Sequence, residues 1–91
     1  PQRGIVHKSN DPKELIMSAR KSRKISGDLQ SNPKLAVEYA RSAIEDCDRA
    51  LSLIPKDQPY LIYLAYVGKL KAMGRYELAK KWQEGKSPDL R

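Results

Sequence analysis

Apolar residues recur along the chain at intervals of three and four, the spacing that places side chains on one face of an α-helix. The pattern is clearest between Ala36 and Ile54, where apolar residues are separated by Glu, Asp and Arg. A weaker strip contains Leu15 and Ala19, and a nearly continuous apolar run covers residues 61–73. The pattern predicts an all-α chain.

Prolines and glycines divide this pattern into four predicted helices. Asp11-Pro12 and Asn32-Pro33 each combine a side chain that caps a helix with a proline at the first helical position, and Glu14 completes a capping box. Pro55 ends the second helix, and we expect Gly74 to close the third by allowing a left-handed turn. The antiparallel helices run over about 11–27, 32–54, 59–73 and 75–84.

The segment after Pro59 allows two interpretations. Residues Tyr60 to Leu64 also have strand propensity, but no second strand is available to pair with them, so a helix is favoured. Because this helix is apolar on most sides, we expect it in the middle of the bundle, where it would touch neighbours on several faces.

Several positions between residues 35 and 84 have the size and spacing of a known repeat. They are Ala43, Cys47, Ala50, Pro55, Gly74, Tyr76 and Ala79. In these positions the region resembles tetratricopeptide repeats, which place small residues at helix contacts, proline at the end of a repeat and glycine in the turn between its helices. An unrelated four-helix bundle is the alternative.

The resemblance implies a small right-handed helical array that acts as an adaptor and binds a peptide segment of a partner protein. The first helix of each repeat would line the groove. The Lys and Asn set of the family's carboxylate-binding members is not found, so the resemblance implies no chaperone-tail function. Such arrays generally need three or more repeats, so two hairpins predict a homo-oligomer, part of a larger array or a capped mini-domain.

Positive charge gathers in the outer parts of the 91-residue chain, which has 18 Lys and Arg, 11 Asp and Glu, and a net charge of +7. The densest cluster is Arg20, Lys21, Arg23 and Lys24. It suits an anionic partner such as an acidic peptide or nucleic-acid phosphates, whereas the alternative is a solvated face that only keeps the domain soluble. No base-reading module accompanies it, so nucleic-acid binding would be sequence-independent.

The candidate partner-binding residues share positive charge or aromatic character. They are Arg20, Lys21, Arg23, Lys24, Tyr63, Tyr66, Lys69 and Trp82. We expect Tyr63, Tyr66 and Lys69 to line the peptide groove, with Arg20 and Lys24 supplying charge. Trp82 is either a lid on the core or an exposed contact. The rival function, nucleic-acid binding, would use the basic cluster together with Lys80 and Lys81.

We do not expect an enzyme, a cofactor or a metal site. The chain has one His and one Cys, and it contains no phosphate-binding Gly-rich loop or nucleophile motif. We expect Cys47 to be a small buried hydrophobe whose thiol pKa is raised by Asp46 and Asp48, which face water together with Glu45. Arg23 to Ser26 matches a basic-directed phosphorylation site, with Ser26 as acceptor.

The sequence predicts a single helical domain over residues 11–85, with flexible tails at 1–10 and 86–91. No apolar run reaches the roughly 20 residues that cross a bilayer, and no signal-peptide pattern opens the chain. A lone cysteine favours a reducing compartment, which makes the expected location intracellular, cytoplasmic or nuclear.

Overall fold

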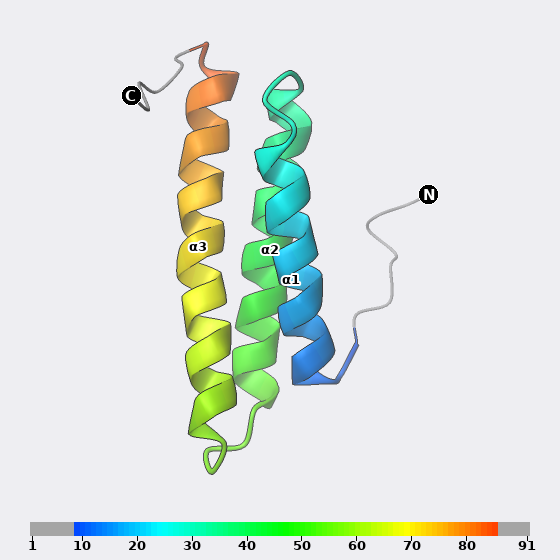
Figure 1. Cartoon of the computed structure of the whole chain (residues 1–91), viewed down its shortest axis with the longest axis vertical. Helices are drawn as coiled ribbons and strands as arrows, with labels where there is room; N and C mark the ends of the chain where they lie inside the picture. The colour runs from blue at the N-terminus through cyan, green and yellow to red at the C-terminus, as the bar shows by residue number, and fades with distance from the viewer. Residues whose placement is uncertain (1–8, 86–91) are drawn as a thin grey trace.

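A computed structural model describes residues 9–85, which form three α-helices and contain no strand (Figure 1). The helices are α1 (Pro12–Gly27), α2 (Pro33–Leu53) and α3 (Pro59–Gln83). The all-α prediction is therefore confirmed. The strand considered at Tyr60 to Leu64 is excluded, since these residues form the first turns of α3. Residues 1–8 and 86–91, where tails were predicted, lie outside the described part of the chain.

The start of α1 is held by side chains on both sides of Pro12. The Asp11 carboxylate accepts the amide of Lys13 at 3.0 Å, as an N-cap residue should. The predicted capping box does not close directly, because the Asp11 amide donates to the Ser9 hydroxyl at 2.9 Å. That hydroxyl donates in turn to Glu14 at 2.6 Å, so Ser9 relays the contact that Glu14 was expected to make.

The bounds of α2 follow from its flanking residues. The Asn32 side chain accepts the amide of Leu35 at 3.3 Å and caps the N-terminus, directly before Pro33. At the other end Ile54 is extended, with ψ of 127°, because the residue before a proline is sterically excluded from the helical region. The predicted end at Pro55 is therefore confirmed.

The predicted third and fourth helices are one continuous helix, so the prediction of four helices was wrong. Gly74 lies inside α3 without a positive φ, and the only positive φ in the described chain belongs to Gly85, which follows the end of α3. A single glycine costs a helix about 1 kcal/mol relative to alanine, which strong helix formers on both sides can offset. The turn that the repeat resemblance placed at Gly74 is therefore absent.

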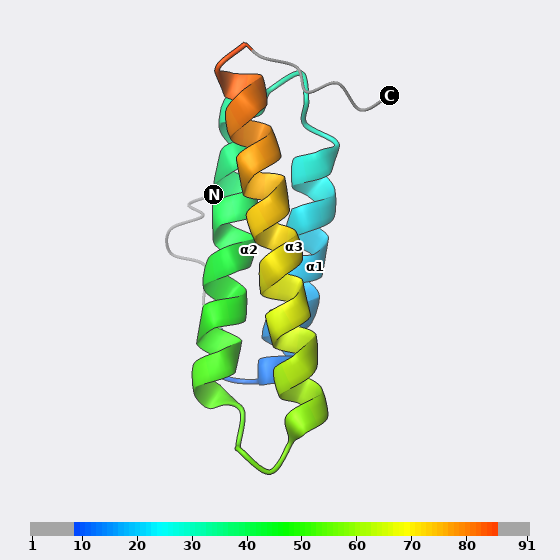
Figure 2. The same cartoon turned by 90° about the vertical axis from the view of Figure 1, so that its left-hand side faces the viewer.

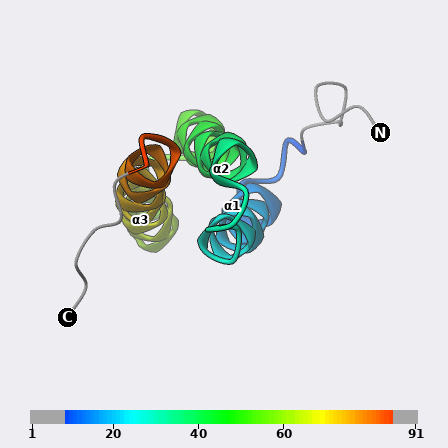
Figure 3. The same cartoon turned by 90° about the horizontal axis from the view of Figure 1, so that it is seen from above.

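The three helices run up, down and up (Figures 1 and 2). Seen along the helices, α2 packs beside both α1 and α3, whereas α1 and α3 touch each other much less (Figure 3). The expectation that the apolar helix after Pro59 lies in the middle is wrong, because α2 has that place. One side of α3 remains open to solvent.

Alanine dominates the core of the described residues. Eight alanines are completely buried: Ala19, Ala36, Ala40, Ala43, Ala50, Ala65, Ala72 and Ala79. In the part of the chain that the structure describes, only three larger aliphatic side chains, Leu15, Val37 and Ile54, are buried with them. Small residues let helix backbones approach closely, so the bundle leaves most of its large apolar side chains partly or fully exposed.

Candidate partner-binding site

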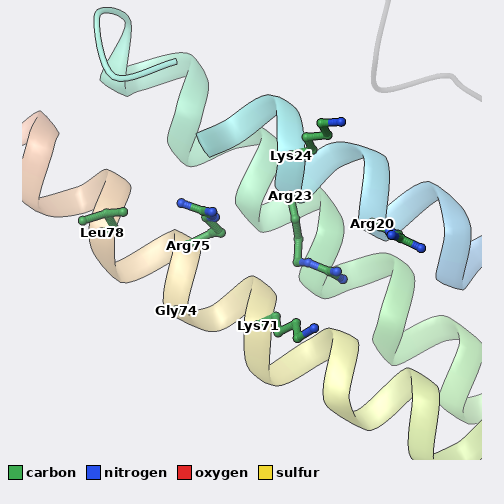
Figure 4. Close-up of a pocket in the computed structure, with 7 residues that line it drawn as sticks. All are labelled: Arg20, Arg23, Lys24, Lys71, Gly74, Arg75 and Leu78. Carbon is green, nitrogen blue, oxygen red and sulfur yellow. The ribbon is translucent and has the colours of Figure 1, made fainter. Parts of the chain in front are cut away.

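A hollow of about 460 Å³ opens where the C-terminal half of α1 faces the C-terminal half of α3, at the upper end of the bundle in Figure 1. It is lined by Arg20, Arg23 and Lys24 of α1 and by Lys71, Gly74, Arg75 and Leu78 of α3 (Figure 4). Arg23 extends from α1 toward α3, and Arg75 extends from α3 toward α1 (Figure 4). Five of the seven lining residues are cations, and none carries a carboxylate.

No Asp or Glu of residues 9–85 is among the residues that line the hollow. The ion pairs formed between residues 9 and 85 join Lys69 to Asp48 and Lys80 to Glu77, so none involves the hollow. Burial lowers the pKa of Arg23, and the nearby charges of Arg20 and Arg75 lower it further, while Cys47 acts in the opposite direction. The hollow is a site of repelling positive charges that an anion would relieve.

Two glycines give the arginines room to enter. A Cβ on Gly27 would lie 3.0 Å from the guanidinium carbon of Arg75, so this side chain rests on the last turn of α1. The carbonyl groups at a helix C-terminus carry partial negative charge, which favours a guanidinium there. A Cβ on Gly68 would lie 3.4 Å from a terminal nitrogen of Arg23. Both glycines thus help to set the position of an arginine.

The groove continues from the cationic hollow into an apolar one. A middle section is lined by Ile16, Met17, Leu64 and Val67 together with Arg20, Arg23, Gly68 and Lys71. The lower section, of about 650 Å³, is lined by Lys13, Ile16, Met17, Gln58, Pro59, Tyr60, Leu61 and Leu64. Neighbouring sections share residues, so they form one groove, which we call the α1/α3 groove. Its lower part is apolar and its upper part cationic.

A second apolar surface lies on another flank of α3. Tyr63, Tyr66, Leu70 and Met73 are exposed and follow one another at intervals of three and four, so they form a stripe. None of them lines the α1/α3 groove. Beside the stripe, Lys69 pairs with Asp48 of α2 at 2.7 Å, and this hydrogen bond raises the pKa of Lys69.

The structure divides the candidate residues between several places. Arg20, Arg23 and Lys24 meet in the cationic hollow, whereas Lys21 is exposed and does not line it. Tyr63, Tyr66 and Lys69 lie on the flank just described, so the structure does not bring them together with Arg20 and Lys24 as expected.

Trp82 and the two lysines of the last turns also lie apart from the groove. Trp82 is half-buried against the cluster of Ala36, Val37 and Ala79, which makes it a lid on the core. Lys80 lies over the Tyr76 ring, 5.0 Å from its centre, and 3.8 Å from Glu77. Neither it nor Lys81 lines the groove.

Sequence reasoning missed Lys71 and Arg75. These residues are one helical turn apart, so they share a face of α3. Their spacing was a usable signal, but a predicted helix end at Gly74 placed them on different helices and concealed it.

Three polar or thiol side chains are buried among residues 9–85. Cys47 is completely buried as predicted, and desolvation raises its pKa to about 11, with smaller contributions from Asp46 and Asp48. Asp46 was expected to face water, but it is buried and accepts the Ser18 hydroxyl at 2.9 Å. Ser26 is also buried and donates to the Ala36 carbonyl at 2.7 Å. A kinase therefore cannot reach Ser26 in the folded domain.

Residues 9–85 bring together no group of three His, Cys, Asp or Glu side chains that could hold a metal ion. Within the same range, no helix combines the length and apolar character that a membrane crossing requires. Comparison with protein-family models, with curated proteins and with solved structures finds no match to this chain. The resemblance to tetratricopeptide repeats therefore stays a prediction.

Proposed function

We propose that the protein is a non-enzymatic interaction module whose α1/α3 groove binds an acidic segment of a partner protein. One observation carries the proposal: five cations from two helices line one hollow that contains no carboxylate. Guanidinium groups form paired hydrogen bonds with carboxylates, so Arg20, Arg23 and Arg75 suit aspartate and glutamate side chains.

The apolar part of the groove favours a peptide over a nucleic acid. A nucleic-acid backbone would occupy the cationic hollow but would leave Ile16, Met17 and Leu64 exposed to water. A protein segment can place apolar side chains there and bury both surfaces, which is worth about 25 cal/mol per Å² before the costs of association.

A pair of charge-reversed variants tests the proposal. The probe is a fluorescent 15-residue peptide with six glutamates, titrated by anisotropy at 100 mM salt. The double variant Arg20→Glu/Lys71→Glu reverses two cations of the hollow, and Lys21→Glu/Lys81→Glu reverses two exposed lysines that do not line it. We expect at least a tenfold loss of affinity for the first variant and less than threefold for the control, with unchanged helical circular dichroism.

Two results would contradict the proposal. Equal losses in both variants would mean that the peptide responds only to net charge, and absence of binding to the wild type would mean that the groove is not an acidic-peptide site. Equal losses would therefore show that the hollow binds the peptide no better than the rest of the cationic surface does.

The same five unneutralised cations also favour a second function, sequence-independent binding of nucleic acid. If all five contacted phosphates of duplex DNA, the affinity would fall about 500-fold between 50 and 200 mM salt, from a slope of about −0.9 per phosphate. Oligonucleotide binding that is tighter than peptide binding and falls this steeply would favour the second function. A peptide held partly by apolar contacts would lose far less affinity.

A further inference from the structure

The α1/α3 groove is long and changes character along its length. From Gln58, directly before α3, to Leu78 it spans about 30 Å, at about 1.5 Å per helical residue. Its lower third is almost entirely apolar around Leu61, and its upper third is cationic around Lys71 and Arg75. Two kinds of surface are therefore fixed in one line by two rigid helices.

We infer that the groove recognises its ligand in two parts, and that the ligand is a helix whose groove-facing side chains are apolar toward one end and carboxylates toward the other. This inference rests on the proposed function and specifies its ligand. Charge complementarity assigns the carboxylates to Arg20, Arg23 and Arg75. The exposed side chains of Met17 and Tyr60, at 62% and 70%, offer the largest apolar area at the other end.

The walls of the groove favour a helical ligand over an extended one. Both walls are helices, whose backbone amides and carbonyls already bond within α1 and α3. An extended peptide would thus find no main-chain partners along most of the groove, whereas a helix satisfies its own. Recognition of an amphipathic helix in a groove relies on side chains at helical spacing, which is what these walls provide.

The length of the groove sets the spacing in the ligand. Leu61 lies near the centre of the apolar part, and the cationic part is centred between Lys71 and Arg75. These centres are about 12 residues apart on α3, or about 18 Å. A helical ligand therefore needs its apolar and acidic groups about three turns apart. An extended ligand would cover the same distance in five or six residues.

The test compares two kinds of peptide of identical composition. A segregated 20-residue peptide carries Leu and Met in one half and Glu in the other, and it is made in both orders. An interleaved peptide distributes the same residues evenly along the same helical face. We expect one order of the segregated peptide to bind at least tenfold tighter than the interleaved peptide, and to gain helical circular dichroism on binding.

Matched variants of the protein locate each half of the ligand. Met17→Ser removes an exposed apolar side chain of the groove, and Leu70→Ser removes one of similar exposure, 59%, on the other flank of α3. We expect Met17→Ser to lower the affinity for the segregated peptide about fivefold, and Leu70→Ser to lower it less than twofold. Arg20→Glu should lower the affinity for both peptides more than Lys21→Glu does.

The outcomes separate this inference from the proposed function. Both peptides could bind with equal affinity, with Met17→Ser having no effect and Arg20→Glu still lowering the affinity. In that case the inference of two-part recognition is wrong, and the acidic-peptide site stands. Binding without a gain of helix also overturns the inference. If neither peptide responds to Arg20→Glu, the proposed function itself fails. Binding to vesicles with 30% anionic lipid but to no peptide would overturn both in favour of a membrane surface.

Discussion

Cys47 of α2 and Gly68 of α3 meet with no space for a side chain between them. A Cβ on Gly68 would lie 3.2 Å from the Cys47 sulfur, which is closer than ordinary van der Waals contact, and Cys47 is itself completely buried. This contact fixes the distance between α2 and α3 at the middle of the bundle. It also lies beside Arg23, because the same Cβ would be 3.4 Å from a terminal nitrogen of that arginine, and Gly68 lines the middle section of the groove.

Two glycine-to-alanine substitutions in α3 should therefore have different effects. Gly74→Ala places a methyl group in open space and should stabilise the protein by about 0.5–1 kcal/mol, since alanine is the better helix former. Gly68→Ala gains the same propensity but crowds Cys47, and overpacking costs about 1–3 kcal/mol, so we expect a net loss. Urea denaturation of both variants measures the difference.

The Gly74 substitution also tests the continuity of α3. If residue 74 occupied a left-handed turn between two helices, alanine there would be strained and Gly74→Ala would destabilise the protein. A loss of stability would thus contradict the three-helix architecture, and a gain in Gly68→Ala would contradict the tight contact with Cys47.

The Cys47 thiol should make stability fall at alkaline pH. Its pKa is raised from 9.0 to about 11 by desolvation, with Asp46 and Asp48 adding to the shift and Arg23 and Lys69 opposing it. Below pH 9 the thiol is protonated in both the folded and the unfolded state. Between pH 9 and 11 the unfolded chain releases the proton first, so the free energy of unfolding should fall by about 2 kcal/mol.

Cys47→Ala isolates this effect, because the substitution removes the thiol and leaves every other titratable side chain of the protein in place. Urea denaturation between pH 8 and pH 11 should show a steeper loss of stability in the wild type than in Cys47→Ala. Parallel curves would mean that the thiol is not buried. A thiol reagent at pH 8 should also react slowly until urea unfolds the chain.

Ser26 should contribute to stability rather than to regulation. Ser26→Ala removes a buried hydrogen bond to the Ala36 carbonyl and should cost about 1–2 kcal/mol. The control, Ser52→Ala, removes an exposed hydroxyl that donates to the backbone carbonyl of Arg49, also at 2.7 Å, and should cost less than about 0.5 kcal/mol. A basic-directed kinase should not modify Ser26 unless the domain is first unfolded, and rapid phosphorylation of the folded protein would contradict its burial.

Repulsion in the cationic hollow should appear as a dependence of stability on salt. Raising NaCl from 20 to 300 mM should stabilise the wild type, because salt screens the charges of Arg20, Arg23 and Arg75 from one another. Arg20→Glu should be slightly more stable than the wild type at low salt, by about 0.5 kcal/mol, since the new carboxylate can pair with Lys24 one turn on. Thermal unfolding at both salt concentrations measures this.

Lys21→Glu is the control for this measurement. It removes the same charge from α1 outside the hollow, so the response to salt should stay closer to that of the wild type. Identical responses in Arg20→Glu and Lys21→Glu would show that net charge, rather than the hollow, governs the salt dependence.

Local signals in the sequence predict most of the helices correctly. Asp11, Asn32 and Pro55 act through neighbouring residues alone, so capping and proline rules place the starts of α1 and α2 and the end of α2. Gly74 is different, because glycine is compatible with both a helix and a turn. The choice depends on how the residues on either side of it pack against α2, and one segment alone does not reveal this.

The candidate site was predictable only in part. The cluster on α1 was visible because Arg20, Arg23 and Lys24 lie close together in the sequence. Their partners Lys71 and Arg75 come from a helix about 50 residues later, and the rotation of α3 about its axis decides which of its faces meets α1. Ala65, Gly68 and Ala72 set that rotation by packing inward, which turns Tyr63 and Tyr66 away from the groove.

The alanine core separates two kinds of constraint on the sequence. A larger residue at Ala43 or Ala72 would push helices apart, so the interior tolerates little change. The large side chains along the α1/α3 groove stand outside this interior, and substitutions there leave the spacing of the helices unchanged. Natural variation or design can therefore alter what the groove binds while one scaffold persists, because the residues that specify the fold and those that face a partner are almost entirely different residues.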